Sequence, residues 1–476
     1  MQSLAGSEGA DGSRDESGMT SKLDASSGQP TKLYRRREFI RTSLLTAGAT
    51  TLLGRKLWAD PPATRIARSG ISREIFIPAP QSGAAVLASS FYTRPTGLDL
   101  LSIQEILTRS DTVDVADFRY SHDNGRTWTK GEQFPTFGVR PTGKLRRGMR
   151  ACIVDPVTGR LLHFYLEAIL PTDDPLEGFR EWVVHYRVSE DGGMTWCVDD
   201  EIIQQGAEYD ADHPVAGVRR GHTCFMIGDT SSQPIFLADG TLLVPIVISP
   251  AGPDGNYLNP SVGYTYSNVA VLRGRWGPDG RHMVWEPSDL IKVDPNLSTR
   301  GMDEPTLAAL ADGRILIVLR GSNDHRPALP GRRWVAYSSD QGRTWTTPRP
   351  WTYTSGEDFF SPASSSQLLT HSSGRLFWLG NIIPANPDGN RPRYPFVIGE
   401  VDRHSGLLDR QSVRVVDDRG PQESALIAFA SGSSREDRET GEIVLNLTRW
   451  GENTKGNDWS EYSWTANAYL YRIPVL

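Results

Sequence analysis

The chain has 476 residues, of which 38% are apolar and 9% aromatic, which is enough for a large hydrophobic core in one or two domains. Its formal net charge is -6, and no basic block follows the first sixty residues, so nothing indicates nucleic acid as a partner. The three cysteines and nine histidines show no metal-ligand spacing, so no metal and no cofactor are expected.

Two segments precede the part of the chain that is expected to fold. Residues 1–34 are rich in Ser, Gly, Asp and Glu, which predicts a disordered extension. Residues 35–59 begin with RRREFIR, in which Arg36 and Arg37 resemble the twin-arginine export pattern, and continue with an apolar stretch too short to span a membrane. We therefore expect a twin-arginine signal peptide, cleaved near Ala59, and a periplasmic or extracellular protein without a membrane span.

The motif S-x-D-x-G-x-T-W occurs three times. It is SHDNGRTW at residues 121–128, SEDGGMTW at 189–196 and SSDQGRTW at 338–345. Ser and Asp side chains can bind nearby backbone amides, and Gly supplies the positive φ of a turn, so each copy predicts a turn between strands. The second interval is close to twice the first, and RWGPDGRHMVW at 275–285 stands where a degenerate fourth copy is expected.

One complete repeat unit lies at residues 302–345. Apolar runs on both sides of Asp312-Gly313 predict a hairpin, WVAY predicts a third strand, and the segment after Trp345 predicts a fourth. Such a unit cannot bury both faces of its sheet alone, so copies must pack around an axis. The prediction is an all-β, six-bladed β-propeller of four-stranded antiparallel blades, occupying residues 60–476.

The three motifs resemble the Asp boxes of the sialidase superfamily, whose six-bladed propellers carry them at blade corners. The resemblance covers most of the chain after residue 70. In such propellers the boxes lie away from the active face, so they imply the fold, and the activity must be sought elsewhere. The resemblance implies an exo-acting glycosidase with an arginine triad that binds a carboxylate, an acidic aspartate, and a glutamate that activates a tyrosine.

The first blade departs from this pattern. Sialidases have an Arg-Ile-Pro motif in the first strand, whereas here Phe76 precedes Ile77 and Pro78, and Arg73 is the nearest arginine. The general acid of sialidases lies ten to twelve residues before the first box. The resemblance therefore implies Asp111 as the acid, while a turn-capping role for this side chain stays open.

The strongest match is in the fourth blade. Sialidases have a glutamate at the start of this hairpin and a triad arginine sixteen residues later, and Glu304 and Arg320 have that spacing. A tight turn between them would bring both side chains to one rim of the central cavity, although a purely structural ion pair stays open. In the third blade, His222 precedes the inner strand and would be the base if the protein were a lyase.

The last two blades supply the remaining candidates. NRPRYPF resembles the segment of the last triad arginine, for which Arg391 and Arg393 are candidates. At the register of the nucleophilic tyrosine stands Glu423, which predicts a Glu304–Glu423 pair in which each carboxyl raises the pKa of the other. A tyrosine from further along the chain, Tyr462 or Tyr469, is the alternative.

These observations predict an exported, sialidase-like glycoside hydrolase, monomeric, that removes a terminal, anionic sugar from a glycan. It would be either an exo-α-sialidase or a relative with altered sugar specificity. Two alternatives stay open on the same propeller. A polysaccharide lyase would use His222 as its base, and a non-catalytic carbohydrate-binding propeller would use Glu304 and Arg320 as a structural pair.

Overall fold

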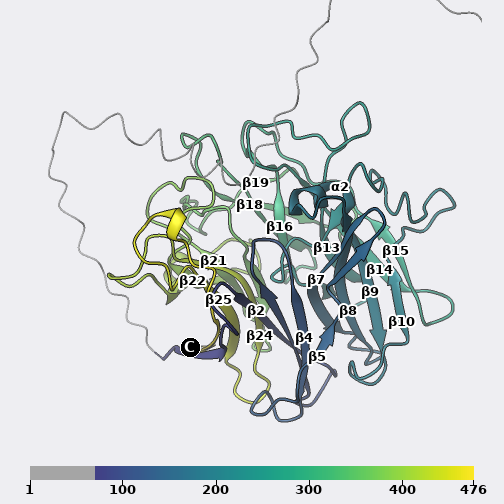
Figure 1. The fold of residues 1–476 in the computed structure, drawn as a ribbon, viewed down its shortest axis with the longest axis horizontal. Coiled ribbons are helices and arrows are strands. Elements are labelled where there is room, and N and C mark those ends of the chain that lie inside the picture. Colours follow the sequence, from purple (N-terminus) through teal and green to yellow (C-terminus); the bar gives the residue numbers. More distant parts are fainter. Residues whose placement is uncertain (1–69, 476) are drawn as a thin grey trace, which may run out of the picture. The chain divides into compact units, whose positions relative to one another are not determined.

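The structure, a computed structural model, describes residues 70–475, so the predicted extension and signal peptide lie outside the described residues. The described chain is almost entirely β-structure and forms six antiparallel sheets (Figure 1). It therefore confirms the predicted six-bladed propeller.

The first three blades follow one another along the chain, and the first two pair neighbouring strands in sequence order. The first contains β2 (Ala85–Tyr92), β3 (Leu100–Leu107), β4 (Val115–Ser121) and β5 (Glu132–Phe134). The second contains β7 (Gly143–Val154), β8 (Leu161–Leu170), β9 (Val183–Ser189) and β10 (Val198–Glu201), with β6 (Phe137–Arg140) added beside β7; the helices η1 (Pro175–Glu177) and α2 (Gly178–Glu181) connect β8 to β9. The third contains β11 (Phe225–Met226) and β12 (Ile235–Phe236), which both pair with β13 (Leu242–Ile248), and then β14 (Asn268–Trp276) and β15 (Met283–Pro287).

The last three blades repeat the pattern, and the sixth closes the ring. The fourth contains β16 (Asp303–Ala309), β17 (Ile315–Arg320), β18 (Arg333–Ser338) and β19 (Arg349–Pro350). The fifth contains β20 (Gln367–Thr370), β21 (Leu376–Asn381), β22 (Phe396–Val401) and β23 (Arg414–Asp417), with η2 (Arg410–Ser412) before β23. In the sixth, β24 (Ala428–Glu436), β25 (Ile443–Trp450) and β26 (Ala468–Ile473) are joined by the N-terminal strand β1 (Ser72–Ile77), and η3 (Trp459–Glu461) lies between β25 and β26.

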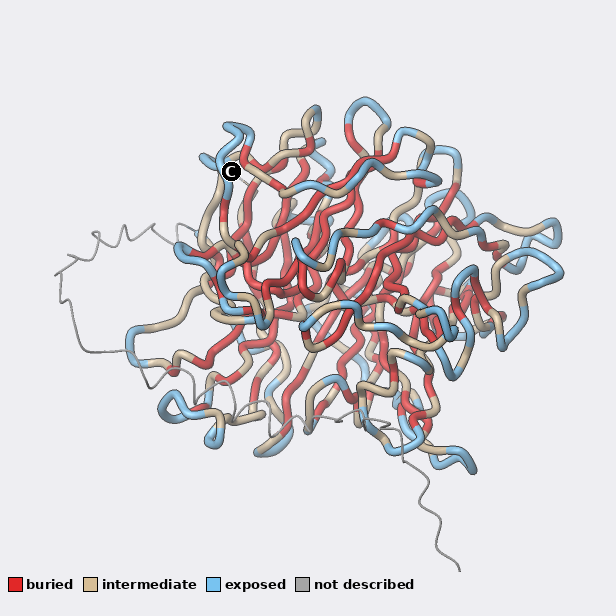
Figure 2. Tube along the Cα trace, turned by 90° about the horizontal axis from the view of Figure 1, so that it is seen from above, coloured by how far each residue is buried: buried red, intermediate tan, exposed pale blue. Residues whose placement is uncertain are grey.

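Each blade buries both faces against its neighbours. In β17, Ile315, Ile317 and Leu319 pack towards the third blade, while Leu316 and Val318 pack towards the fifth. Successive side chains of a strand point to opposite faces, which explains why the sequence here is continuously apolar. Six apolar clusters result, one for each pair of adjacent blades. Figure 2 shows the buried segments gathered in the interior and the exposed segments mainly in the outer connections.

The Asp boxes form the predicted turns. In the third box the Ser338 hydroxyl accepts a bond from the Gly342 amide at 2.8 Å, and the Asp340 carboxylate accepts bonds from the amide and hydroxyl of Thr344 at 2.9 and 2.7 Å. This box joins β18 to β19, and the turn between β16 and β17 lies at the same end of the blade. The start of β16 and the end of β17 therefore lie at the opposite end, away from the boxes.

Candidate active site

Glu304 and Arg320 meet at the end of the fourth blade opposite the Asp box. Asp303 and Arg320 are partners in the β16–β17 ladder, which places Glu304 beside the end of β17. Nη1 of Arg320 donates to Oε1 of Glu304 at 2.5 Å, and only 8% and 12% of the two side chains are exposed. The sixteen-residue spacing therefore brings the two side chains together, because one tight turn returns the chain to the rim.

The backbone of Glu304 is in an unusual conformation. Its φ is 40°, in the left-handed region that residues with a side chain rarely adopt, and the ladder of β16 shifts register between Asp303 and Thr306. Gly228, in the third blade, packs against this bulge so closely that an added Cβ would lie 3.0 Å from the Glu304 Cα. Strain of this kind persists where the surrounding structure holds it, and it is concentrated at functional sites.

Four further arginines surround this pair, and none forms an ion pair with a carboxylate among residues 70–475. Arg393 donates to the Ala363 carbonyl at 2.6 Å, and Arg391 to the Leu426 carbonyl at 2.8 Å. Burial lowers the pKa of Arg393, and the positive charges of Arg320 and Arg391 lower it further. These arginines thus carry more positive charge than the neighbouring carboxylates balance, in a region that is partly shielded from solvent. We call these five side chains the arginine cluster: Arg300, Arg320, Arg333, Arg391 and Arg393.

Two members of the arginine cluster are held by hydroxyl groups. Arg300 donates from Nε and Nη2 to the Thr265 hydroxyl at 3.0 and 2.6 Å. Arg333 is the ladder partner of Arg320, is fully buried, and donates to the hydroxyls of Ser361 and Ser364 at 3.1 and 2.9 Å. Burial lowers the pKa of both guanidinium groups. Neutral partners fix their positions without neutralising their charge.

An aromatic wall from the sixth blade adjoins the arginine cluster. The guanidinium carbon of Arg391 lies 4.6 Å from the ring centroid of Trp459, which packs in turn against Tyr462 at 5.0 Å. Burial raises the pKa of Tyr462, and hydrogen bonding and positive charge from Arg391, with a smaller contribution from Arg393, oppose that rise. Of the two tyrosines proposed as alternatives, Tyr462 is the one that lies beside Arg391.

Two known families match the sequence. The BNR repeat-like domain matches residues 146–417, and the BNR/Asp-box repeat matches residues 119–130, which contain the first box. The chain belongs to the BNR-repeat family of sialidase-superfamily propellers. The resemblance inferred from the three boxes is thereby confirmed. None of the curated proteins matches this BNR-repeat sequence.

Three solved structures share the fold of this BNR-repeat propeller. A protein of unknown function from Dyadobacter fermentans has a TM-score of 0.54 at 13% identity, over 85% of this chain and 100% of that one. The Trypanosoma rangeli sialidase has a TM-score of 0.53 at 14% identity, over 85% of this chain and 59% of that one. The intramolecular trans-sialidase from Ruminococcus gnavus, in complex with oseltamivir carboxylate, has a TM-score of 0.51 at 12% identity, over 82% and 94%. At these identities the likeness shows a common fold.

Glu423 lies in a different ion-pair network from Glu304. Its carboxylate is held by both Nη atoms of Arg449, at 3.0 and 3.1 Å, and also accepts a bond from the Gly420 amide. Burial raises the pKa of Glu423, but the hydrogen bonds and charge of Arg449 outweigh it, so the pKa is lowered. The expected rise from a Glu304–Glu423 carboxylate pair is therefore wrong, because Arg449, at the end of β25, neutralises Glu423.

The first-strand arginine and the second alternative tyrosine belong to this same network. Nη1 of Arg73 binds Asp417 at 2.7 Å, and the Tyr469 hydroxyl donates to Glu452 at 2.7 Å. Phe76, at the register of the first triad arginine, packs its ring against Trp128 with 5.7 Å between centroids. The network joins the fifth and sixth blades, so Arg73 has a partner outside the arginine cluster.

Asp111 and His222 both lie in exposed connections. Asp111 is in the turn between β3 and β4, at the same end of the ring as Glu304, with φ 57°, and its carboxylate accepts a bond from the neighbouring Ser110 at 2.5 Å. Nδ1 of His222 lies 2.8 Å from Oδ1 of Asn256. Their proposed chemical roles stay predictions.

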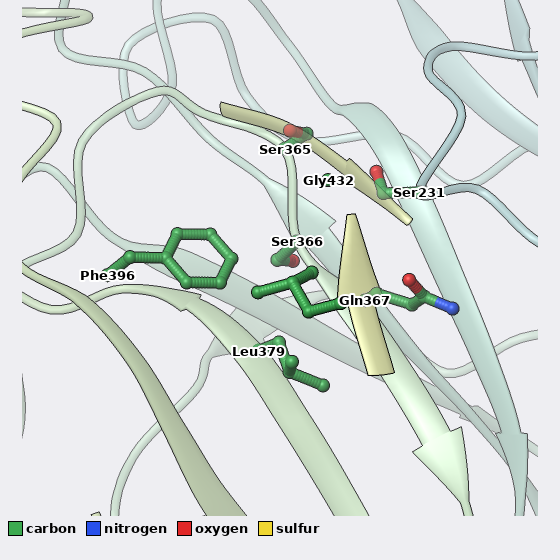
Figure 3. Close-up of a pocket in the computed structure, with 8 residues that line it drawn as sticks. Ser231, Ser365, Ser366, Gln367, Leu379, Phe396 and Gly432 are labelled. Carbon is green, nitrogen blue, oxygen red and sulfur yellow. The ribbon is translucent and has the colours of Figure 1, made fainter. Parts of the chain in front are cut away.

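The sequence reasoning missed Arg300, Arg333 and Asp229 as members of the site. Asp229 lies between β11 and β12, beside Glu304. The negative charge of Glu304 contributes to the raised pKa of Asp229. A small cavity of about 10 Å³ is lined by the polar residues Ser231, Ser365 and Ser366 together with apolar residues that include Leu379 and Phe396 (Figure 3). This is about the least space that can hold one water molecule.

Two further observations concern metal ligands and membrane-spanning helices. Among residues 70–475, no three His, Cys, Asp or Glu side chains are grouped so that they could hold a metal ion. No helix in that range has the length and apolar character needed to cross a membrane.

Proposed function

We propose that this BNR-repeat propeller is an exported, sialidase-like glycoside hydrolase that acts as a single chain and removes a terminal, anionic sugar from a glycan. The arginine cluster would hold the anionic group of the sugar. The groups that break the glycosidic bond would be supplied at the same end of the ring.

The observation that carries the proposal is the excess of arginine over carboxylate. A buried charge is costly unless it is paired, and guanidinium groups bind carboxylates in a planar, bidentate manner. Arg391 and Arg393 have carbonyl partners in place of carboxylates, and Arg300 has a hydroxyl partner. A substrate carboxylate placed among them would gain from all three charges, and it would relieve their mutual repulsion.

Glu304 and Tyr462 suit hydrolysis of an anionic sugar. A carboxylate nucleophile would be repelled by the charge of such a substrate, and sialidases are glycosidases that use a tyrosine instead. Tyr462 lies beside Arg391, whose charge favours its ionised form against burial. Glu304, bound by Arg320 at 2.5 Å, would be the group that accepts the tyrosine's proton.

The names of the structural neighbours agree with this proposal. Two of the three are a sialidase and an intramolecular trans-sialidase, the latter bound to a carboxylate compound. They share only the fold with this chain, so the support for an anionic sugar comes chiefly from the arginine cluster.

Turnover of a substrate panel by the purified protein tests the proposal. The panel contains aryl sialosides, neutral aryl glycosides and uronate polymers. We expect the wild type to cleave the sialosides, and Glu304→Gln to lower kcat/KM by about 10²–10⁴-fold, the usual contribution of a group that transfers a proton in the transition state. Glu208→Gln, in an exposed loop, is the matched control and should retain wild-type turnover.

Other outcomes would favour the alternatives. Release of an unsaturated uronate that depends on His222 would indicate a lyase. Sugar binding without turnover of any substrate would indicate a non-catalytic propeller. Preference for neutral glycosides over sialosides would show that the arginine cluster does not select the substrate.

A further inference from the structure

Asp229 lies at the point where the inner strand of the third blade is interrupted. Residues 227–234 separate β11 from β12, and Asp229 projects from this segment with Oδ1 bound by the Thr230 hydroxyl and the Ser231 amide at 3.0 and 3.3 Å. Its Oδ2 accepts a bond from the Ser431 hydroxyl of the sixth blade at 3.2 Å. The carboxyl is therefore fixed from two blades.

The segment that carries Asp229 is in direct contact with Glu304. Its preceding residue, Gly228, is the one at which an added Cβ would lie 3.0 Å from the Glu304 Cα and 3.2 Å from its Cγ. Although Asp229 is surrounded by protein, its side chain is not closed off from solvent. Asp229 is therefore only partly buried.

Four charged side chains face Asp229, and they come from four different strands: Glu105 (β3), Arg150 (β7), Glu304 (β16) and Arg320 (β17). Arg150 is held by the Ile227 carbonyl at 2.9 Å, one residue before Gly228. Burial, followed by the negative charge of Glu304, raises the pKa of Asp229 to about 6, and Arg150 opposes this rise. Asp229 thus keeps a proton at a pH where ordinary aspartates have lost it.

Two neighbouring carboxyl groups differ in the groups that bind them. Glu304 is bound by the Arg320 guanidinium at 2.5 Å, whereas Asp229 is bound by hydroxyl and amide groups and faces a like charge that contributes to its raised pKa. Unlike surroundings of two neighbouring carboxyl groups are a general sign of divided acid and base roles. Asp111, by comparison, lies in an exposed turn beside Ser110.

We propose that Asp229 is the catalytic acid of this site, an inference that rests on the proposed glycosidase function. The oxygen of Tyr462, whose proton passes to Glu304, bonds to the anomeric carbon as the bond to the leaving oxygen breaks, and the carboxyl proton of Asp229 passes to that leaving oxygen. Water then adds its hydroxyl group to the anomeric carbon and gives a proton to Asp229, while the tyrosine oxygen leaves and regains its proton from Glu304. Glu304, bound by Arg320, thus serves as the base and Asp229 as the acid.

Leaving-group dependence tests this assignment. Asp229→Asn and Asp111→Asn are compared on sialosides with an aryl leaving group, which needs little protonation, and with a sugar leaving group, which needs much. We expect Asp229→Asn to lower kcat/KM by about 10²–10⁴-fold for the sugar leaving group and by less than about 10-fold for the aryl one. Activity of the wild type should fall as pH rises through about 6, and this limb should be absent in the variant. Asp294→Asn, an exposed loop change, is the matched control.

Each result decides between assignments. Full activity of Asp229→Asn on the sugar leaving group, or leaving-group dependence in Asp111→Asn instead, overturns the inference and leaves the proposed function intact. A wild type that cleaves no glycoside overturns both. Asp229→Glu keeps a carboxyl group, so it should retain part of the turnover of the sugar leaving group, with the fall in activity at a different pH from that of the wild type. If Asp229→Asn does not fold, Asp229→Glu becomes the test, and absence of this turnover overturns the inference.

Discussion

Carboxyl groups that are buried or part-buried differ in the direction of their pKa shift according to the group that binds them. Glu105 is 2% exposed, and one of its oxygens accepts the Met149 amide at 2.7 Å. Burial raises its pKa to about 7, against the opposing charge of Arg150. Glu423 is also part-buried, yet its direct bonds from Arg449 lower its pKa. A direct guanidinium partner, more than burial, decides which of these acids is ionised.

The raised pKa of Glu105 has a consequence for stability. In the unfolded chain a glutamate loses its proton near pH 4.3, whereas in the folded protein Glu105 keeps it up to about pH 7. Folding therefore takes up a proton between these values, and the free energy of unfolding falls as pH rises through this window, by up to about 3 kcal/mol. Glu105→Gln removes this dependence, so its melting temperature relative to wild type should be higher at pH 8 than at pH 5.

Thermal unfolding at both pH values checks this expectation. Glu132→Gln, on the exposed edge strand β5, is the control and should shift little between them. A difference between Glu105→Gln and wild type that is equal at pH 5 and pH 8 would show that Glu105 is ionised in the folded protein.

The sequence could identify residues of the site only where a regular hairpin carried them. Glu304 and Arg320 were predictable because one tight turn and the pairing of β16 with β17 bring them to the same end of the hairpin, in spite of the bulge at Glu304. Asp229 and Arg300 were not, because they lie between strands, where no periodicity places a side chain. Glu423 was misjudged because its partner Arg449 follows it by a whole strand, and no local pattern indicates such a pair.

At the scale of elements, bulges in the inner strands shape the site. The ladders shift register at Met149–Cys152 in β7, at Asp303–Thr306 in β16 and at Ala430–Ser433 in β24. Two of these bulges contain residues with positive φ, Glu304 and Ser431. A bulge re-aims a side chain without ending the strand. The repeat predicted the strands correctly, but the bulges leave no trace in the alternation of apolar residues.

The element at residues 35–59 lies outside the described residues, and its role rests on the sequence. If it is a twin-arginine signal, the full chain made in a bacterium with that export system should be recovered from the periplasm or medium. Arg36→Lys combined with Arg37→Lys should retain it in the cytoplasm, because the pair is the recognised feature. Arg35→Lys is the control. Equal export of all three forms, measured by cell fractionation, would contradict the assignment.

At the scale of the whole ring, the site is a property of several blades together. Glu304 and Arg320 come from the fourth blade, Arg391 and Arg393 from the fifth, and Tyr462 from the sixth. The pairing of β1 with β26 closes the ring and so fixes the sixth blade beside the first. The repeat and the number of blades could be predicted from the three Asp boxes and the chain length. The proximity of these side chains could not, because it depends on how the blades pack.

The proposed function requires the arginine cluster to bind a carboxylate, and calorimetric titration with a free sialic acid and with its methyl ester measures this binding. We predict that the wild type binds the acid about 10–100-fold more tightly than the ester, as expected for charge-assisted hydrogen bonds. Arg393→Met should remove most of that preference. Equal affinity for acid and ester in the wild type would contradict the account.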